Sequence, residues 1–391
     1  MSCAHDTNQK RDEHVHMDCR ADWDFPNFPG YGGCMATLGQ RAKDCLAARS
    51  VTQKSVAEAV GMSPDALSRS LNDERNFTAT ELAALADLLD EDLRWLITGE
   101  HDPFRAVVAA RHDYDQETRQ RSVPGAADDR AALRDIELAY RQAYLPGEPV
   151  TTPLPKSAKA ARAALGEDFV RPFIRRLESA LGVDVVRYPG LSTAWSFVIG
   201  GRPVIAIPTT SNWFRENFDL AHELAHLSAG HHGGRHRVSD EKEGAANAFA
   251  AGLLMPKDEL TAVDWQAITL AQLARLVWDL GVSTTALANR LSSLRLAVSD
   301  EVAVGLDGST PSLLRRHLPD AQLEIARRSQ DAAVRQFPAR LIAAHEEKIA
   351  QGALGRSTLA WMLAVEEDQL QVEMPAADEG LSSDELLALL G

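Results

Sequence analysis

The chain is poor in cysteine, and it lacks any apolar run long enough to cross a membrane. It has 4 cysteines in 391 residues, all within the first 45 positions. Cysteines this few and this clustered exclude a disulfide-stapled scaffold. The N-terminus also lacks the apolar core of a signal peptide. We therefore expect a cytoplasmic protein without a membrane anchor.

Positive charge is also in short supply. The sequence has 41 Lys and Arg against 56 Asp and Glu, which gives a formal net charge of −15. This balance argues against a general nucleic-acid coat but leaves room for one local DNA-reading patch. The sequence has no internal repeat and no phosphate-binding glycine loop. Its length allows two or three domains, so function has to be sought in local motifs.

The most informative motif is HExxH, formed by His222, Glu223 and His226. Residues four apart lie on one face of a helix, so the two imidazoles can bind one metal ion. A catalytic zinc ion takes nitrogen or oxygen ligands and keeps one position open for water. Glu223 lies beside that face and can take a proton from the water. The motif predicts a zinc peptidase.

The flanks of the motif distinguish this interpretation from a plain buried helix with one structural histidine. Small residues (Ala221, Ala225) and apolar residues (Phe218, Leu220, Leu224) surround the motif on all sides. A helix of this composition is expected to be buried nearly all round. Two histidines and a glutamate inside it then need polar or metal partners.

Two residues are candidates for the third metal ligand. Glu243 lies on a second predicted helix that ends near Met255, and Asn247, one turn further on, can orient a ligand from behind. His232 is the alternative, because residues 226–232 nearly match the HxxGxxH continuation of metzincins. However, Ala229 stands where that pattern has glycine, and Gly230 comes one place late. The helix, its apolar face and Asn247 favour Glu243.

Residues 218–226 and 243–256 resemble the ImmA/IrrE family of bacterial metallopeptidases. The hairpin-like stretch 199–207 and the segment 281–291 also fit, and the resemblance covers about residues 156–296. It implies a zincin-like fold, the Zn²⁺ ligands His222, His226 and Glu243, and Glu223 as general base. Family members typically cut a repressor and so release a stress or phage response. Asp219 departs from the family pattern, which has an uncharged residue there.

Residues 36–100 predict a second functional unit of five short helices, over 38–48, 52–60, 63–71, 80–89 and 91–97. Gly61 and Met62 form a turn, and Ser63-Pro64 supplies an N-cap and a proline at the first helical position. A helix, a tight glycine turn and another helix make the geometry that inserts a recognition helix into the major groove. Basic residues around it are expected to face phosphates, namely Arg41, Lys43, Arg49, Lys54, Arg69 and Arg75.

This unit resembles the XRE (lambda-repressor-like) helix-turn-helix. The resemblance implies a double-stranded DNA operator as partner, bound by a homodimer, with Gln53, Ser63, Ser68 and Arg69 as the groove-facing residues. Lys and Arg contacts to the backbone would set affinity, and these four residues would set sequence choice. The alternative is a five-helix module that serves dimerisation or grips another repressor.

The remaining segments predict helices with little readable chemistry. Residues 1–34 form a flexible extension with Cys and His at no standard metal-binding spacing. Residues 101–155 form a helical connector (helix 126–144) and a Pro-rich linker. The peptidase domain, 156–299, has a helix over 163–181 and strands over 183–188, 195–199 and 203–207. Residues 300–391 form a helical region, with His317 and His345 at the surface.

The sequence as a whole predicts a mostly α (α+β) protein. It combines the helix-turn-helix (35–100), a zincin-like domain with a small β-sheet, and a helical C-terminal region. We expect a transcriptional regulator with a zinc endopeptidase that cleaves a repressor-type protein. The rival hypothesis is a transcription factor whose zinc domain is a non-catalytic sensor or protein-binding platform. A third hypothesis is an antitoxin-like partner of a toxin.

Overall fold

The computed structural model describes residues 36–49, 51–89, 91–102, 107–110, 113–114, 121–122, 126–144, 153–232 and 240–372. The predicted N-terminal extension and most of the Pro-rich linker lie outside these ranges. Within them the chain is mostly helical, with a four-stranded and a two-stranded sheet, so the predicted fold class is confirmed. Among the described residues, no helix combines the length and the apolar character that a membrane span needs.

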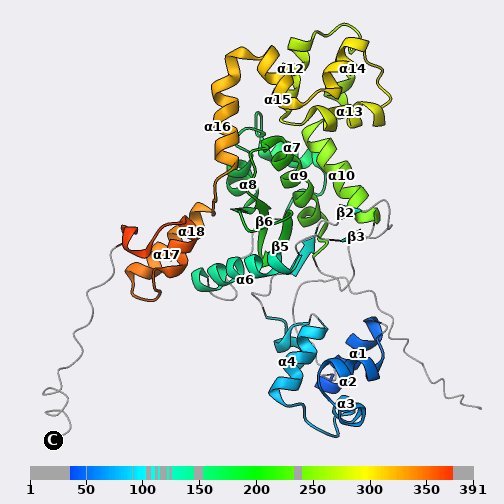
Figure 1. Cartoon of the computed structure of the whole chain (residues 1–391), viewed down its shortest axis with the longest axis vertical. Coiled ribbons are helices and arrows are strands. Elements are labelled where there is room, and N and C mark those ends of the chain that lie inside the picture. The colour runs from blue at the N-terminus through cyan, green and yellow to red at the C-terminus, as the bar shows by residue number, and fades with distance from the viewer. Residues whose placement is uncertain are drawn as a thin grey trace, which may run out of the picture. The chain divides into compact units, whose positions relative to one another are not determined.

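The first five helices form a module of their own (blue in Figure 1), and their positions confirm the predicted pattern. Local capping explains where the two central helices begin. The Thr52 and Ser63 side chains accept backbone hydrogen bonds at the starts of the second and third helices. Buried aliphatic residues from all five helices form one separate core. The helices are α1 (Leu38–Arg49), α2 (Gln53–Ala59), α3 (Pro64–Leu71), α4 (Ala79–Leu88) and α5 (Leu93–Thr98).

Two of the basic residues expected to face phosphates are used inside the module. Arg41 is only 8% exposed, and its guanidinium donates to the carbonyl oxygens of Leu96 and Ile97. Arg75 makes two hydrogen bonds to Glu81, at 2.8 and 2.9 Å. The prediction for Arg41 is therefore wrong, because α1 needs this side chain to hold the end of α5.

The larger sheet has the strand order β1-β5-β6-β4. Strands β4 (Asp184–Tyr188) and β6 (Arg202–Pro208) are parallel, whereas β5 (Trp195–Ile199) is antiparallel to β6. Strand β1 (Val107–Ala110) is antiparallel to β5 on its other side. Gly200 and Gly201 join β5 to β6 with positive φ angles of 55° and 79°. Such a two-residue turn favours glycine, as the sequence predicted.

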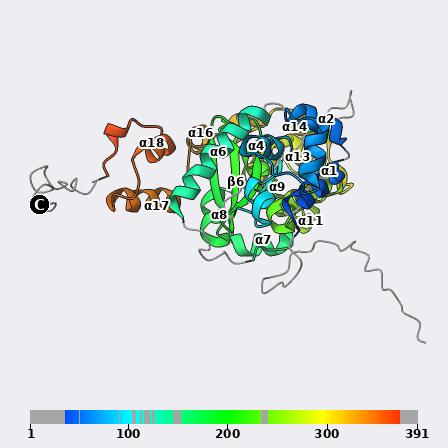
Figure 2. The same ribbon diagram turned by 90° about the horizontal axis from the view of Figure 1, so that it is seen from below.

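Helices cover both faces of this sheet. Successive strand residues point to opposite faces, so each strand contributes buried side chains to both cores. Val186, Val204 and Ala206 belong to a core shared with α6 (Ala126–Ala143), α17 (Ala339–Ala350) and α18 (Ser357–Leu363). Both views show α6 lying across the sheet with α17 next to it (Figures 1 and 2). Val185 and Ile205 face the core on the opposite side of the sheet. The helices on that side include α7 (Ala158–Leu165), α8 (Phe173–Leu181), α9 (Trp213–Ala229) and α10 (Asp240–Leu254).

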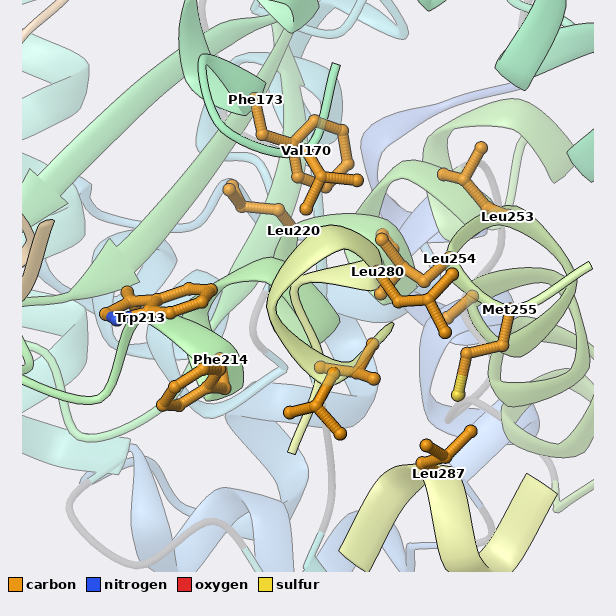
Figure 3. Close-up of a cluster of buried hydrophobic side chains, with 14 of the residues drawn as sticks. Val170, Phe173, Trp213, Phe214, Leu220, Leu253, Leu254, Met255, Leu280 and Leu287 are labelled. Carbon is orange, nitrogen blue, oxygen red and sulfur yellow. The ribbon is translucent and has the colours of Figure 1, made fainter. Parts of the chain in front are cut away.

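The core around α9 also includes α12 (Leu270–Leu280) and α13 (Thr284–Ser293), with the short α11 (Lys257–Thr261) beside it. Figure 3 shows side chains from α8, α9, α10, α12 and α13 gathered there. Gly281 links α12 to α13 with a φ of 62°. A Cβ atom at this position would lie 2.0 Å from Val170 Cγ1, so only glycine fits.

The same core continues into the C-terminal helices. Leu306, Leu313 and Leu314 pack in it, and all are nearly or fully buried. The Arg187 guanidinium on β4 donates hydrogen bonds to Glu216 of α9 and to the carbonyl oxygen of Asp331, which lies in α16 (Gln322–Ala332). The elements after residue 299 are α14 (Asp300–Asp307), α15 (Thr310–His317), η1 (Pro319–Ala321), α16 (Gln322–Ala332), α17, α18 and η2 (Glu367–Gln369).

Some local predictions were wrong. The single helix predicted over 163–181 is two helices, because the chain breaks at Gly166 (φ 81°) and Pro172. The connector 101–155 contains strands β1, β2 (Asp113–Tyr114) and β3 (Arg121–Ser122) besides α6. His345 is fully buried rather than at the surface, since its Nε2 contacts the carbonyl oxygen of Ala139 on α6.

Candidate metal centre

Helix α9 carries the HExxH residues inside the protein. Asn212 caps its first turn, and Gly230 ends it in a left-handed conformation with φ 69°. Nearly every residue between these caps is buried, as the flanking sequence predicted. His222, Glu223 and His226 each have 0% exposure. Polar groups buried this deeply are costly unless they have partners, so the contacts of these three define the site.

His222, His226 and Glu243 meet at one point between α9 and α10. The two Nε2 atoms are 3.1 Å apart. His222 Nε2 lies 3.3 Å from Glu243 Oε2, and His226 Nε2 lies 3.5 Å from Glu243 Oε1. In the described part of the chain, these three residues form the group with ligand atoms near enough to share a metal ion. The sequence therefore named the residues that the fold brings together.

The separations suit a tetrahedral zinc ion. Ligand atoms roughly 2.0–2.2 Å from zinc lie about 3.3–3.6 Å from one another when the angles are tetrahedral. His222 Nδ1 is 3.0 Å from Asn247 Oδ1, so this nitrogen carries the proton and Nε2 keeps its lone pair. Asn247 thus has the orienting position that the sequence assigned to it. His226 Nδ1 is likewise 2.9 Å from His231 Nδ1.

Electrostatics favour a charged carboxylate at Glu243. Burial raises its pKa, but the contacts with His222 and His226 outweigh burial and hold the pKa below its ordinary value. A charged carboxylate together with two imidazole nitrogens is a donor set that zinc prefers. Burial, followed by the neighbouring His226, lowers the pKa of His231 to about 4. His231 therefore stays neutral at physiological pH, and its Nδ1 can accept a hydrogen bond from His226 Nδ1.

The Glu223 carboxylate is in contact with strand β5. Ser196 Oγ lies 2.6 Å from Glu223 Oε2 and donates a hydrogen bond to it. His232 Nε2 is 3.1 Å from the same Ser196 oxygen. Because the Ser196 hydroxyl has one proton, which goes to Glu223, His232 is the donor in the second contact. Ser196 was missed by the sequence analysis, since nothing in its local pattern marks it.

His232 thus lies outside the ligand group. Gly230 turns the chain so that His231 faces His226 while His232 faces Ser196. Burial, with smaller effects of His226 and His231, lowers the pKa of His232 to about 4, which keeps its ring neutral. The described geometry gives no support to His232 as the third ligand.

Asp219, which departs from the family pattern, lies one turn before Glu223. It is 4% exposed, and its Oδ2 is 3.5 Å from Arg215 Nε. Asp219 and Asn247 both line a groove of about 660 Å³ that α9, α10 and α13 enclose. Phe218, Met255 and Arg290 line the same groove, which therefore offers apolar and polar contacts and reaches the ligand group through Asn247.

The predicted DNA-contacting residues lie around the turn between α2 and α3. Gln53 and Arg69 are exposed, Ser68 is half-buried, and Ser63 is exposed while its hydroxyl caps α3. Ser63 is thus partly committed to the fold. Lys54 is also exposed. Contact with DNA by these residues stays a prediction.

A buried HExxH helix with a carboxylate from a second helix is the arrangement of zinc peptidases, and comparisons with known families agree. The family model of the IrrE N-terminal-like domain matches residues 178–292. A helix-turn-helix family model matches residues 43–96. Searches of curated proteins and of solved structures gave no match. The two family matches confirm the predicted resemblance to an XRE-type helix-turn-helix fused to an ImmA/IrrE-like peptidase domain.

Proposed function

We propose that this protein is a DNA-binding regulator with a zinc-dependent endopeptidase domain. The convergence of His222, His226 and Glu243, with Glu223 beside them, supports this proposal most strongly. Zinc, when bound by the three residues, supplies a Lewis acid that activates water and polarises a peptide carbonyl. Asn247 and His231 hold the imidazoles in the tautomers that such binding needs.

Glu223 has the role of general base and then general acid. Its carboxylate accepts a proton from the attacking water and returns it to the nitrogen of the leaving amine. Ser196 fixes the orientation of the carboxylate through the 2.6 Å hydrogen bond. Because Glu223 is fully buried, the protein shields this proton from bulk solvent.

The substrate in this proposal is a repressor-type protein, and its cleavage would start a stress or phage response. The groove that Asn247 lines also contains Phe218, Met255 and Arg290 and can accept a side chain of mixed character. The helix-turn-helix would bring the enzyme to an operator as a homodimer. Such a regulator would act in the cytoplasm, where it meets the chromosome.

The rival function is a zinc-binding sensor or protein platform without peptidase activity. Three metal ligands are enough for such a role. The structure adds a fourth buried ionisable group, Glu223, with a hydroxyl donor aimed at its oxygen. A platform has no need for that carboxylate, so its placement favours the enzyme.

The test measures metal content and proteolysis together. The purified full chain should contain one zinc ion by mass spectrometry and should cleave a co-expressed XRE-type repressor. The Glu223→Gln variant should keep its zinc and lose cleavage by roughly 10²–10⁴-fold, since an amide cannot accept the proton. Undiminished cleavage by Glu223→Gln would exclude the mechanism. Zinc without cleavage of any repressor by the wild type would favour the sensor.

A further inference from the structure

Strand β1 lies where the sheet would otherwise end. Strand β5 uses one edge to pair with β6, and its other edge is paired with β1. The register aligns Val107 with Val198 and Ala109 with Ser196. An unpaired strand edge presents a row of backbone donors and acceptors, and such an edge binds any extended segment that can reach it. Strand β1 therefore covers a potential binding edge.

The covered edge is the one nearest the catalytic carboxylate. Ser196, the second residue of β5, donates to Glu223 and is the register partner of Ala109. A segment paired with β5 at this point runs directly past the strand position that holds Glu223. A peptide bond can reach Glu223 most directly from an extended segment on this edge, because strand addition fixes the backbone by main-chain hydrogen bonds.

We infer that β1 is an autoinhibitory strand: it occupies the β5 edge in place of an extended segment of the protein substrate. The inference rests on the proposed peptidase function for its consequence, but the occupancy itself does not depend on catalysis. Substrate gains access when β1 leaves the edge, and the enzyme is restrained while β1 stays.

Two properties of β1 fit a reversible inhibitor. The strand has four residues, so it forms few ladder hydrogen bonds and can be displaced. It also belongs to the same chain as the edge, so its effective concentration is high and it rebinds readily. β1 follows the helix-turn-helix directly in sequence, between α5 and α6. Partner or operator binding by that module is therefore one event that can change the occupancy of the edge.

Disulfide trapping tests the occupancy without any need for activity. In the full chain with Cys3, Cys19 and Cys34 changed to Ser, the pair Val107→Cys and Val198→Cys should crosslink under mild oxidation. The matched control, Val107→Cys with a cysteine at the exposed α8 residue Ser179 (Ser179→Cys), should not. Zinc content should be unchanged, and the crosslink should lower repressor cleavage at least tenfold until reductant is added. No crosslink above the control would overturn the inference.

A second experiment frees the edge. The variant Val108→Pro/Ala109→Pro removes two of the four backbone N–H groups of β1 and fixes their φ angles, which disrupts its pairing with β5. A labelled synthetic peptide of residues 105–112 should then bind the zinc-loaded variant at least tenfold more tightly than the wild type. Amide exchange at residues 195–198 should rise in the variant and fall when the peptide is added.

These results separate the two proposals. Tighter peptide binding together with crosslinking, but no hydrolysis of any protein, would support the occupied edge and refute the peptidase. Equal peptide binding by wild type and variant would refute the autoinhibitory strand whatever the proteolytic activity. Cleavage of the wild-type chain within residues 107–110 would also refute it, because β1 would then be a substrate.

Discussion

Ser196 of strand β5 donates a 2.6 Å hydrogen bond to Glu223 of helix α9, although 27 residues separate them in the sequence. This contact joins the sheet to α9 at the carboxylate that we propose as general base. It fixes which oxygen of Glu223 faces the sheet, and it brings β5 and its edge next to the proposed catalytic group.

Replacing Ser196 by Ala should lower kcat while zinc stays bound. A hydrogen bond to a charged group contributes roughly 1.5–3 kcal/mol, which corresponds to about 10–100-fold in rate. The acidic limb of the pH–rate profile should also move to higher pH, because the carboxylate loses a donor that favours its charged form. Ser196→Thr, which retains a hydroxyl, is the control. An unchanged kcat and pH profile for Ser196→Ala would rule out the positioning role.

The ligand set can be tested by metal retention during dialysis against a chelator. Glu243→Gln should lose zinc, because it removes a charged ligand. Asn247→Ala should bind zinc roughly 10–100-fold more weakly, since His222 loses its orienting partner. His232→Ala should keep wild-type zinc content. The opposite pattern, with zinc lost in His232→Ala and kept in Glu243→Gln, would restore the metzincin-like ligand set.

Glu178 should make the folded state less stable as pH rises toward neutrality. Burial, followed by the charge of Asp184, raises the pKa of Glu178 to about 7. Between its ordinary pKa and about 7 the native state binds more protons than the unfolded chain, so the free energy of unfolding falls with rising pH.

The variant Glu178→Gln cannot ionise and should remove this pH dependence. At pH 8 it should be more stable than the wild type by about 1–2 kcal/mol, a discounted figure because the carboxyl group is only partly buried. At pH 4 the two should unfold alike. Urea titrations at both pH values measure the difference, with exposed Glu167→Gln as the control. A wild-type advantage at pH 8 would contradict the sign.

The DNA prediction centres on Arg69, which is exposed at the C-terminal end of α3. If Arg69 reads a guanine edge, Arg69→Ala should cost the full chain about 1–3 kcal/mol at its specific site. If it contacts only phosphate, binding should weaken uniformly across sequences, with a shallower salt dependence. Footprinting on fragments around its own gene is the measurement. Arg75→Ala serves as a control, because Arg75 is engaged by Glu81 within the module. No protected site would leave the module as a protein-interaction device.

The sequence predicted the parts of the site that depend on local periodicity. His222 and His226 share a helical face at a spacing of four residues, and the Gly200-Gly201 turn fixed the hairpin. Glu243 was also predicted as the third ligand, because its helix carries Asn247 on the same face. Each of these inferences needs only one element or its immediate neighbour.

What the sequence did not predict depends on long-range packing. Ser196 is an ordinary strand serine until α9 packs on β5. His345 looked like a surface residue, since its burial requires that α17 pack on α6. The short strand β1 has too few residues for a period to be read. The break at Gly166 and Pro172 has a local cause instead. Both residues are helix stop signals, but the apolar periodicity runs across them and favours one continuous helix.

The Arg187 side chain sets a lower limit on how far the chain can be shortened. Its guanidinium donates hydrogen bonds to Glu216 of α9, to the Gln336 side chain and to the Asp331 carbonyl oxygen. A chain ending at residue 299 would keep this buried ion pair but remove the acceptors on Asp331, Val334 and Gln336, which is costly for a charge out of contact with water. The segment after residue 299 therefore stabilises the peptidase domain by satisfying the buried Arg187 guanidinium. Expression of that domain as a minimal unit should extend at least to residue 337.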